Sequence, residues 1–163
     1  MNLKELQEKQ RELDNYIIKK RDITFQGKER ILSLFLSAFS EIQETENDIE
    51  NPEEWIDILH FVLSIANELD IDLVYTGTFN NKYTLTTYLD EVRKDLTKAM
   101  DVEASYKFWK TIELDYTSKM VLKHLLQKLC VNINQACNFI GEDLETQYLM
   151  KHQKNIDRQI NGY

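Results

Sequence analysis

Four carboxylates flank the only proline of the sequence, in two pairs with the same spacing. Glu41 and Glu44 precede Pro52, and Glu54 and Asp57 follow it. Residues three apart project from one face of an α-helix, so two helices that fold back on each other here would bring the four acids together across one seam. Clustered negative charges repel, at about 4 kcal/mol for each close pair with an effective dielectric near 20. The pattern therefore predicts a site for Mg²⁺ or Mn²⁺, which prefer oxygen ligands.

The residues around the proline predict where the two helices meet. Asn51 has the side chain of an N-cap residue, Pro52 suits the first helical position, and the Glu54 carboxylate meets the positive helix end. The polar residues 46–48 should end the preceding helix. The hairpin register that follows pairs Glu44 with Glu54 and, one turn further along, the other two acids with each other.

Ordinary solvated surface charge is the alternative explanation for these acids. The chain contains 28 Asp and Glu residues and has a net charge of −8, and helix N-termini favour acidic side chains. The composition of the second helix argues for a site, because Asp57 and His60 lie in a segment that should be mostly buried, where an acid needs a partner. The apolar residues of that segment are Trp55, Ile56, Ile58, Leu59, Phe61, Val62, Leu63 and Ile65.

The composition predicts one all-α domain over residues 1–163, a bundle of about five to six helices. Hydrophobic residues make up 42% and aromatic residues 10%, enough for a substantial core. Four glycines and one proline are too few for the many tight turns of a β-sandwich or barrel.

Charge and hydropathy bound the partners and the compartment. The acidic balance argues against general attraction to nucleic acid or to anionic membranes. No N-terminal segment resembles a signal peptide, and no run approaches the roughly 20 apolar residues of a membrane span. We therefore expect a cytoplasmic protein that binds neither nucleic acid nor membrane.

The cysteines and histidines do not form a metal pattern. Cys130 and Cys137 lie about 10 Å apart along one predicted helix, too far for a disulfide within it, and we expect both to be reduced core residues. His60, His124 and His152 show no zinc-site spacing.

Helical periodicity runs through most of the chain, with a break expected near Asp101. The stretch 71–83 alone has β-like composition and is either a strand or a loop. Gly141 should end the longest helix, whose apolar residues, including Met120 and Phe139, occupy more than one face and predict a central position. The predicted helices cover residues 3–20, 28–45, 52–69, 84–100, 103–109, 114–140, and 142 to near the C-terminus.

A second polar group lies near the C-terminus. Lys151, Asn155 and Arg158 follow at spacings of four and three on one helical face, with Tyr148 one turn earlier. Lysine supplies a mobile charge and arginine a bidentate fork, which together suit the oxygens of a di- or triphosphate. A solvated cationic helix end, favoured by the C-terminal dipole, is the alternative.

This C-terminal segment, YLMKHQKNIDRQINGY over residues 148–163, resembles the C-terminal motif of the all-α dimeric dUTPase family. Residues 54–64, EWIDILHFVLS, resemble the second half of the ExxE…ExxD metal site in the wider MazG-like group of nucleoside triphosphate pyrophosphohydrolases. The likeness extends loosely over the whole chain and is sharp in these two segments.

The resemblance implies a helical homodimer that binds Mg²⁺ and hydrolyses dUTP to dUMP and pyrophosphate. In that reading the acidic quartet holds the metal, and its first pair also supplies the catalytic carboxylates. The implied metal ligands are Glu41, Glu44, Glu54 and Asp57, with Glu41 and Glu44 catalytic, and the implied phosphate-binding residues are Lys151, Asn155 and Arg158.

The chain departs from the family pattern between the acidic pairs, where an extended segment with aromatic and lysine residues is usual and only residues 45–53 are present. A second alignment puts Ala38 at the first acid position, makes Glu41 the second, and leaves one ligand absent. Two other functions remain open: hydrolysis of another (deoxy)nucleoside triphosphate, and a catalytically inactive helical dimer that acts as a protein-interaction module. Candidates for contact with a base, none of them assigned, are Trp55, Phe61, Asn67 and the segment 75–83.

Overall fold

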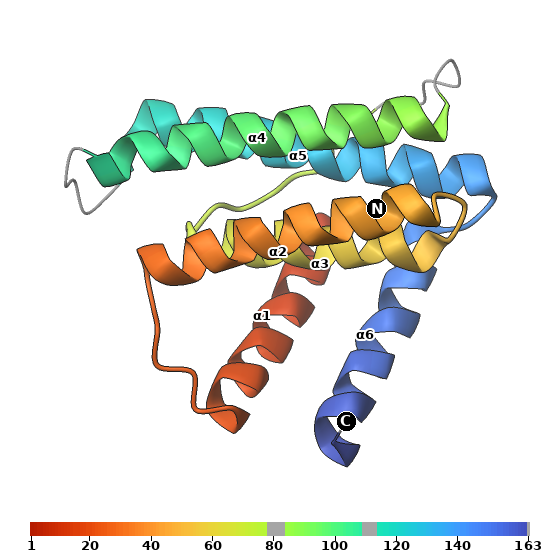
Figure 1. Ribbon diagram of the computed structural model, residues 1–163, viewed down its shortest axis with the longest axis horizontal. Coiled ribbons are helices and arrows are strands. Elements are labelled where there is room, and N and C mark those ends of the chain that lie inside the picture. The colour runs from red at the N-terminus through yellow and green to blue at the C-terminus, as the bar shows by residue number, and fades with distance from the viewer. Residues whose placement is uncertain (78–83, 109–113, 163) are drawn as a thin grey trace.

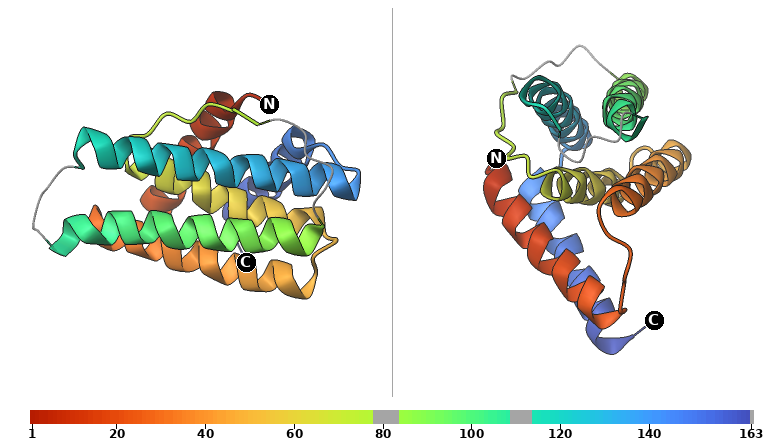
Figure 2. Two further views of the ribbon diagram at one scale, coloured as in Figure 1. Left: turned by 90° about the horizontal axis from the view of Figure 1, so that it is seen from above. Right: turned by 90° about the vertical axis from the view of Figure 1, so that its left-hand side faces the viewer.

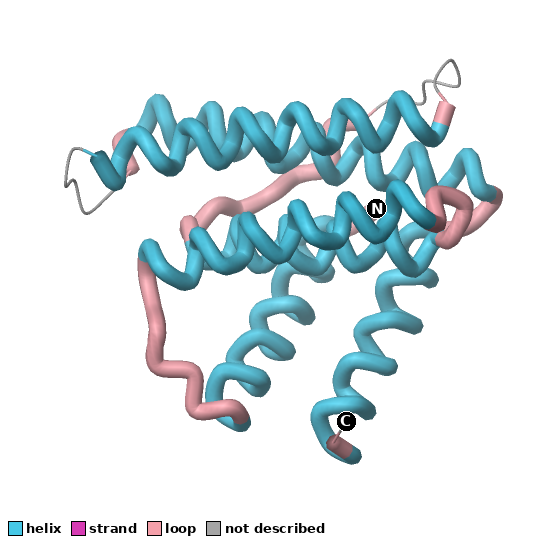
Figure 3. The backbone as a smooth tube through the Cα atoms, viewed as in Figure 1, coloured by secondary structure: helices cyan, strands magenta, loops and turns pink. Residues whose placement is uncertain are grey.

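The computed structural model of the chain describes residues 1–77, 84–108 and 114–162, and only the backbone of residues 104–108. The described residues form helices and loops without a strand, which confirms the predicted all-α class (Figure 3). The six helices are α1 (Leu3–Lys20), α2 (Lys28–Asn47), α3 (Pro52–Glu68), α4 (Leu85–Phe108), α5 (Tyr116–Ile140) and α6 (Leu144–Asn161).

The helices form two antiparallel pairs, and α1 and α6 form a third pair below them (Figure 1). α4 and α5 make one layer, and α2 and α3 make the layer beneath it. α1 and α6 contact each other and α3, and they extend steeply away from the two layers (Figure 2). Because α3 contacts α1, α2, α5 and α6, it is the element around which the others are organised.

Side-chain caps and a glycine define the helix ends. The side chains of Asn51, Asp115 and Asp143 each accept a hydrogen bond from a backbone N–H two or three residues further on, at the starts of α3, α5 and α6. Gly141 ends α5 with φ of 93°, a left-handed backbone conformation that residues other than glycine rarely adopt. The predicted start at Pro52 and end at Gly141 are therefore confirmed.

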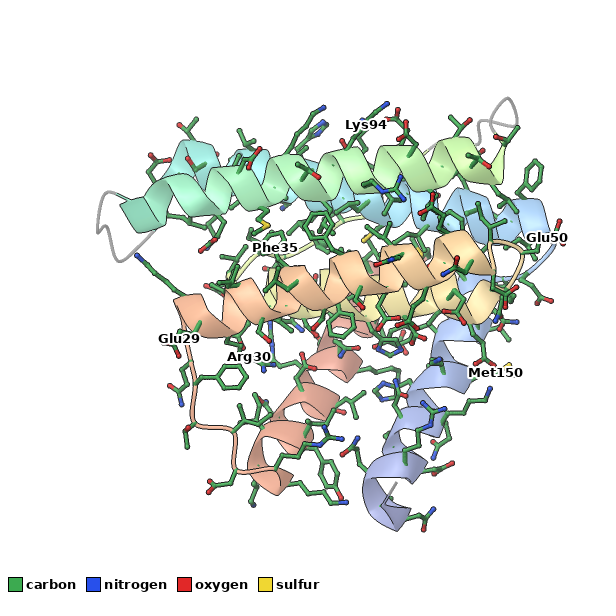
Figure 4. The ribbon with its side chains drawn as sticks, viewed as in Figure 1. Glu29, Arg30, Phe35, Glu50, Lys94 and Met150 are labelled. Atoms are coloured by element: carbon green, nitrogen blue, oxygen red, sulfur yellow. The ribbon has the colours of Figure 1, made fainter. Side chains whose placement is uncertain are left out.

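Apolar residues of α3 form the centre of the core. Trp55 is completely buried, and its indole N–H donates to the carbonyl of Ile49 at 2.9 Å, which ties the α2–α3 turn to the core. Phe35 of α2 is also fully buried and lies toward the α4–α5 layer, whereas Lys94 lies on the outer surface (Figure 4). Burial of such side chains stabilises the fold by roughly 1.5–3 kcal/mol each.

The expected break near Asp101 is wrong, because α4 continues through it to Phe108. Neither glycine nor proline interrupts this part of the sequence. A polar residue on a helical surface is compatible with continued backbone hydrogen bonding, so one aspartate is a weak stop signal.

The central position predicted for α5 is also wrong. α5 lies with α4 in an outer layer, and Met120 and Phe139 are 46% and 56% exposed. The buried faces of α5 contact α4, α3 and α6, which explains why its apolar residues occupy more than one stripe without full enclosure.

The segment after α3 is a loop over its described residues 71–77, and the rest of the predicted stretch, 78–83, lies outside the described residues. Glutamine side chains hold this loop: the amide oxygen of Gln7 accepts from the backbone N–H of Leu73 at 2.8 Å, and that of Gln127 accepts from Val74 at 2.9 Å. Side-chain amides thus replace the partner strand that β-like composition would suggest.

Both cysteines are buried and free, as predicted. None of the described helices has the length and apolar composition needed to cross a membrane.

Candidate functional site

Three of the four predicted metal ligands meet at the α2–α3 hairpin. One carboxylate oxygen from each of Glu41, Glu44 and Glu54 lies within 4.8 Å of those of the other two. The short turn after α2 and the start of α3 at Pro52 produce this register. Ala38, the acid position of the second alignment, is fully buried in the core. The geometry therefore favours the alignment that pairs Glu41 with Glu44.

The acid trio of Glu41, Glu44 and Glu54 has no cationic side chain of its own. No salt bridge among the described residues includes any of the three. Glu54 accepts one neutral hydrogen bond, from the side chain of Asn51 at 3.3 Å. Carboxylate oxygens that converge without an ion-pair partner among the described side chains are the donor set that suits a hard divalent cation, so the residues fit Mg²⁺ or Mn²⁺.

Asp57, the fourth predicted ligand, stands apart from the acid trio in the described structure. Its Oδ2 accepts a hydrogen bond from the Lys151 ammonium at 2.7 Å, and the same ammonium lies 3.6 Å from Glu53 Oε2. Asp57 and Lys151 are 94 residues apart in sequence, so this ion pair joins α3 to α6. The pairing of a predicted metal ligand with a predicted phosphate ligand was not expected from the sequence.

Burial and mutual repulsion shape the electrostatics of the acids. Burial, then the charges of Asp57, Glu44 and Glu54, raises the pKa of Glu41 to about 7. Burial is also the largest cause of the raised pKa of Asp57, although the bond from Lys151 opposes it. Both pKa values are raised, so the fold holds these two carboxylates in an environment that disfavours their charged forms.

The predicted phosphate-binding residues line the same cleft as most of the acids. A cleft of about 510 Å³ lies between α1, α2, α3 and α6, a volume suited to a small ligand. Lys151, Asn155 and Arg158 line it from α6, whereas Glu41 and Glu44 line it from α2. The structure therefore brings together two groups of residues that are more than 100 positions apart in sequence.

The cleft continues along the helices beyond the acids. On α2, Ser37 and Ser33 line it one and two turns before Glu41, and on α3, His60 and Ser64 line it beyond Asp57. The distance along α3 from Glu54 to Ser64 is about 15 Å by helix rise, comparable with an extended nucleotide. The acidic end and the end with Ser33 and Ser64, which Asp14 and Arg30 also line, are therefore parts of one continuous surface.

A buried polar network beside the cleft was missed by the sequence analysis. Gln10 Oε1 accepts from the Tyr148 hydroxyl at 3.0 Å and lies 2.5 Å from His60 Nδ1, and Gln10 Nε2 donates to Asp14 at 2.9 Å. Ser64 Oγ donates to the other Asp14 oxygen at 2.7 Å. The available signal was the spacing of Gln10 and Asp14, two polar residues four apart that flank the apolar stripe of α1.

Burial keeps the histidine of this network neutral. Burial, together with the charges of His152 and Lys151, lowers the pKa of His60 to about 3, so its ring is neutral near pH 7. The ring stacks on Tyr148 with centroids 4.7 Å apart. His60 is therefore a neutral, oriented ring in the wall of the cleft.

Most candidates for contact with a base have other roles. Trp55 is buried in the core, and Asn67 exchanges hydrogen bonds with Gln7. Phe61 does line the cleft. Tyr75 accepts a hydrogen bond from Asn134 at 2.8 Å, while Tyr83 lies outside the described residues.

Comparison with known protein families identifies the family of the chain. The family model described as dUTPase matches residues 2–163, essentially the whole chain. The chain belongs to the dUTPase family. Membership makes it a dUTPase-like hydrolase and supports dUTP diphosphatase activity, with a nucleotide as the substrate class. No curated protein and no solved structure matches the chain significantly.

Family membership fits the residues that line the cleft. The match spans both acidic pairs and the C-terminal segment. The cleft has lysine and arginine side chains from α6 beside clustered carboxylates from α2, residue types that suit a hydrolase acting on a nucleoside triphosphate.

Proposed function

We propose that the protein hydrolyses dUTP to dUMP and pyrophosphate in this cleft, with Mg²⁺ bound by Glu41, Glu44, Glu54 and Asp57. The observation that carries the proposal is the acid trio, whose oxygens converge within 4.8 Å and have no cationic partner among the described side chains. Mn²⁺ can substitute in this proposal because it has similar ligand preferences. Membership of the dUTPase family supports the choice of substrate.

The cations of α6 bind the triphosphate chain in this proposal. Lys151 supplies a mobile ammonium, Arg158 a planar fork for two oxygens, and Asn155 a neutral donor between them on the same helical face. The nucleoside then extends toward the Ser37 and His60 end of the cleft. The helices of the core hold both ends rigidly, because α3 contacts α2 as well as α6.

The reaction replaces one P–O bond by another. The oxygen of a water molecule bonds to phosphorus as the bond to the oxygen bridging the α- and β-phosphates breaks, and attack at either phosphorus gives the same two products. A bound divalent cation neutralises charge on the phosphate oxygens and lowers the pKa of water. Either Glu41 or Glu44 accepts the proton that the water releases, and Lys151 and Arg158 stabilise the negative charge on the products.

Pyrophosphate release from a panel of deoxynucleoside triphosphates, with Mg²⁺ and with a chelator, tests the proposal. We expect turnover of dUTP with Mg²⁺ and none with the chelator. Preference for another base would reassign the substrate within the hydrolase class. Absence of turnover with every nucleotide and metal would favour the inactive interaction module.

We also propose a homodimer, the assembly that the family resemblance implies. Light scattering after size-exclusion chromatography should give twice the chain mass of 19.4 kDa, and a mass of one chain would contradict it. The cytoplasmic location expected from the sequence stays a prediction.

A further inference from the structure

Lys151 lies between two carboxylates of α3, beside the acid trio. Its Nζ donates to Asp57 Oδ2 at 2.7 Å and lies 3.6 Å from Glu53 Oε2. Only 8% of Lys151 is exposed, so its ammonium has lost most of its water. A buried cation requires opposite charge nearby, and these two carboxylates provide it.

Asp57 consequently has two competing uses. The proposed function makes it a ligand of a divalent cation, yet in the described structure it is the hydrogen-bonded counter-ion of Lys151. An ammonium and a divalent cation within a few ångströms of one carboxylate repel each other. A divalent cation on Asp57 therefore weakens the attraction between this carboxylate and Lys151 and favours withdrawal of the ammonium.

We propose that Lys151 exchanges partners during the binding cycle: it neutralises Asp57 before Asp57 joins the metal ligands, and it then moves to the phosphates of the nucleotide. The inference rests on the proposed function and adds that one side chain links metal entry to phosphate binding. Asp57 loses a cation and gains a cation in the exchange, so the number of unpaired buried charges does not rise.

The surroundings of Lys151 permit this movement. Lysine has a flexible four-carbon stem, and Lys151 lines the same cleft as Glu41 and Arg158. Phosphates that enter beside Arg158 thus come within reach of the released ammonium. Lys154 follows Lys151 by three residues on α6. It pairs with Glu53 on the outside and does not line the cleft, which makes it a matched control.

The first measurement is Mn²⁺ binding by titration calorimetry without nucleotide. Lys151→Met should bind Mn²⁺ about tenfold more tightly than wild type, because Asp57 is freed from a competing cation. Lys154→Met removes the same charge from the same helix and should stay within about twofold. Lys151→Gln, which retains a neutral donor, should shift the affinity in the same direction by less, and thermal unfolding checks that each variant is folded.

The second measurement is binding of inorganic pyrophosphate with Mn²⁺ saturating. Here Lys151→Met should bind about tenfold more weakly, because the released ammonium no longer contacts a phosphate. Lys154→Met should again stay near wild type. Tighter metal binding with weaker pyrophosphate binding is the signature of exchange, since general damage to the site would weaken both.

A double-mutant cycle assigns the effect to Asp57. In the Asp57→Asn background, Lys151→Met should change Mn²⁺ affinity no more than Lys154→Met does, because the competition no longer exists. An undiminished tenfold effect there would contradict the exchange and indicate general electrostatics.

The remaining outcomes separate this inference from the proposed function. Mn²⁺ affinity that is equal or weaker in Lys151→Met would overturn the exchange and leave metal-dependent hydrolysis standing. Failure of the wild-type protein to bind Mn²⁺ would overturn the exchange and the metal site together. Wild-type Mn²⁺ binding with the predicted shifts but without dUTP turnover would support the exchange and reject the substrate.

Discussion

The acids of α4 and the acid trio of the α2–α3 hairpin differ in whether they have ion-pair partners. On α4, Asp90, Glu91 and Asp95 all have lysine partners, and Lys128 of α5 lies 3.3 Å from Asp95, whose side chain is only 1% exposed. At the α2–α3 hairpin, the acid trio has no lysine or arginine partner within the described part of the chain.

The difference separates a packing role from a binding role. The α4–α5 layer contributes no described residue to the cleft, so its acids need only be compatible with a stable fold. The hairpin holds three acids together at a cost in repulsion, and a cation from solution would offset that cost. An acid that the fold leaves without a counter-charge is more informative about function than the total charge of the chain.

The largest expected effect distinguishes these regions by activity. Glu54→Gln or Asp57→Asn should lower dUTP turnover by at least about 100-fold, because each removes a charged metal ligand. Asp95→Asn, the same chemical change in the α4–α5 layer, should leave turnover per folded molecule within about twofold. Pyrophosphate release at saturating Mg²⁺ measures all three. Full activity in both Glu54→Gln and Asp57→Asn would remove the proposed site.

Stability should respond with opposite signs in the two regions. Without metal, Glu41→Gln should raise the free energy of unfolding by about 1 kcal/mol, because it removes repulsion from Asp57, Glu44 and Glu54. Asp95→Asn should lower it by about 1–2 kcal/mol, because it breaks a half-buried ion pair with Lys128. Urea unfolding with a chelator measures both changes.

Mg²⁺ provides the control for that comparison. It should stabilise the wild-type protein by mass action, and stabilise Glu41→Gln much less, because the variant has one ligand fewer. Destabilisation by Glu41→Gln in the chelator would show that the acids are not under repulsion, and would make the two regions alike.

The sequence was sufficient for the fold class and for the acidic hairpin, because both depend on local patterns. Helical periodicity, the scarcity of glycine and the Asn51–Pro52 start signal act within a few residues of each other. The second group of charges could be placed on one face of α6 for the same reason. Its position opposite Asp57 could not be predicted, because helix periodicity does not say which helices pack together.

Other parts of the cleft have no strong local signal. Gln10 lies on α1 and its partner Tyr148 on α6, so their hydrogen bond depends on the tertiary fold.

The outer position of α5 was missed because apolar residues on two faces indicate two packing partners, and only the fold shows that a third face is exposed.

The pH dependence of stability should be set partly by His60. Its folded pKa of about 3 lies below its unfolded value near 6.5, so the unfolded state binds the proton more tightly and stability falls as the pH drops below 6.5 toward 3. Between pH 6 and pH 4, the free energy of unfolding should fall with a slope up to about 1.4 kcal/mol per pH unit steeper than in His60→Phe. Parallel profiles for the two proteins would show that His60 is not held neutral. His124→Phe, at an exposed histidine of α5, is the control.

The smallest effect is expected at the exposed pair on α4. Lys94→Met breaks the ion pair with Asp90, in which the charged atoms lie 2.8 Å apart and both side chains are exposed. Water and salt screen such a pair, so the thermal unfolding midpoint and the dUTP turnover should match wild type within error. A clear loss of either would mean that the α4 surface does more than the comparison assigns to it.

The most direct test of the central claim is the anomalous diffraction signal of a crystal grown with Mn²⁺. We predict a peak bonded to carboxylate oxygens of Glu41, Glu44 and Glu54, at roughly the 2.0–2.2 Å typical of such ions. Absence of a peak there, with the three carboxylates turned away from each other into solvent, would contradict the account.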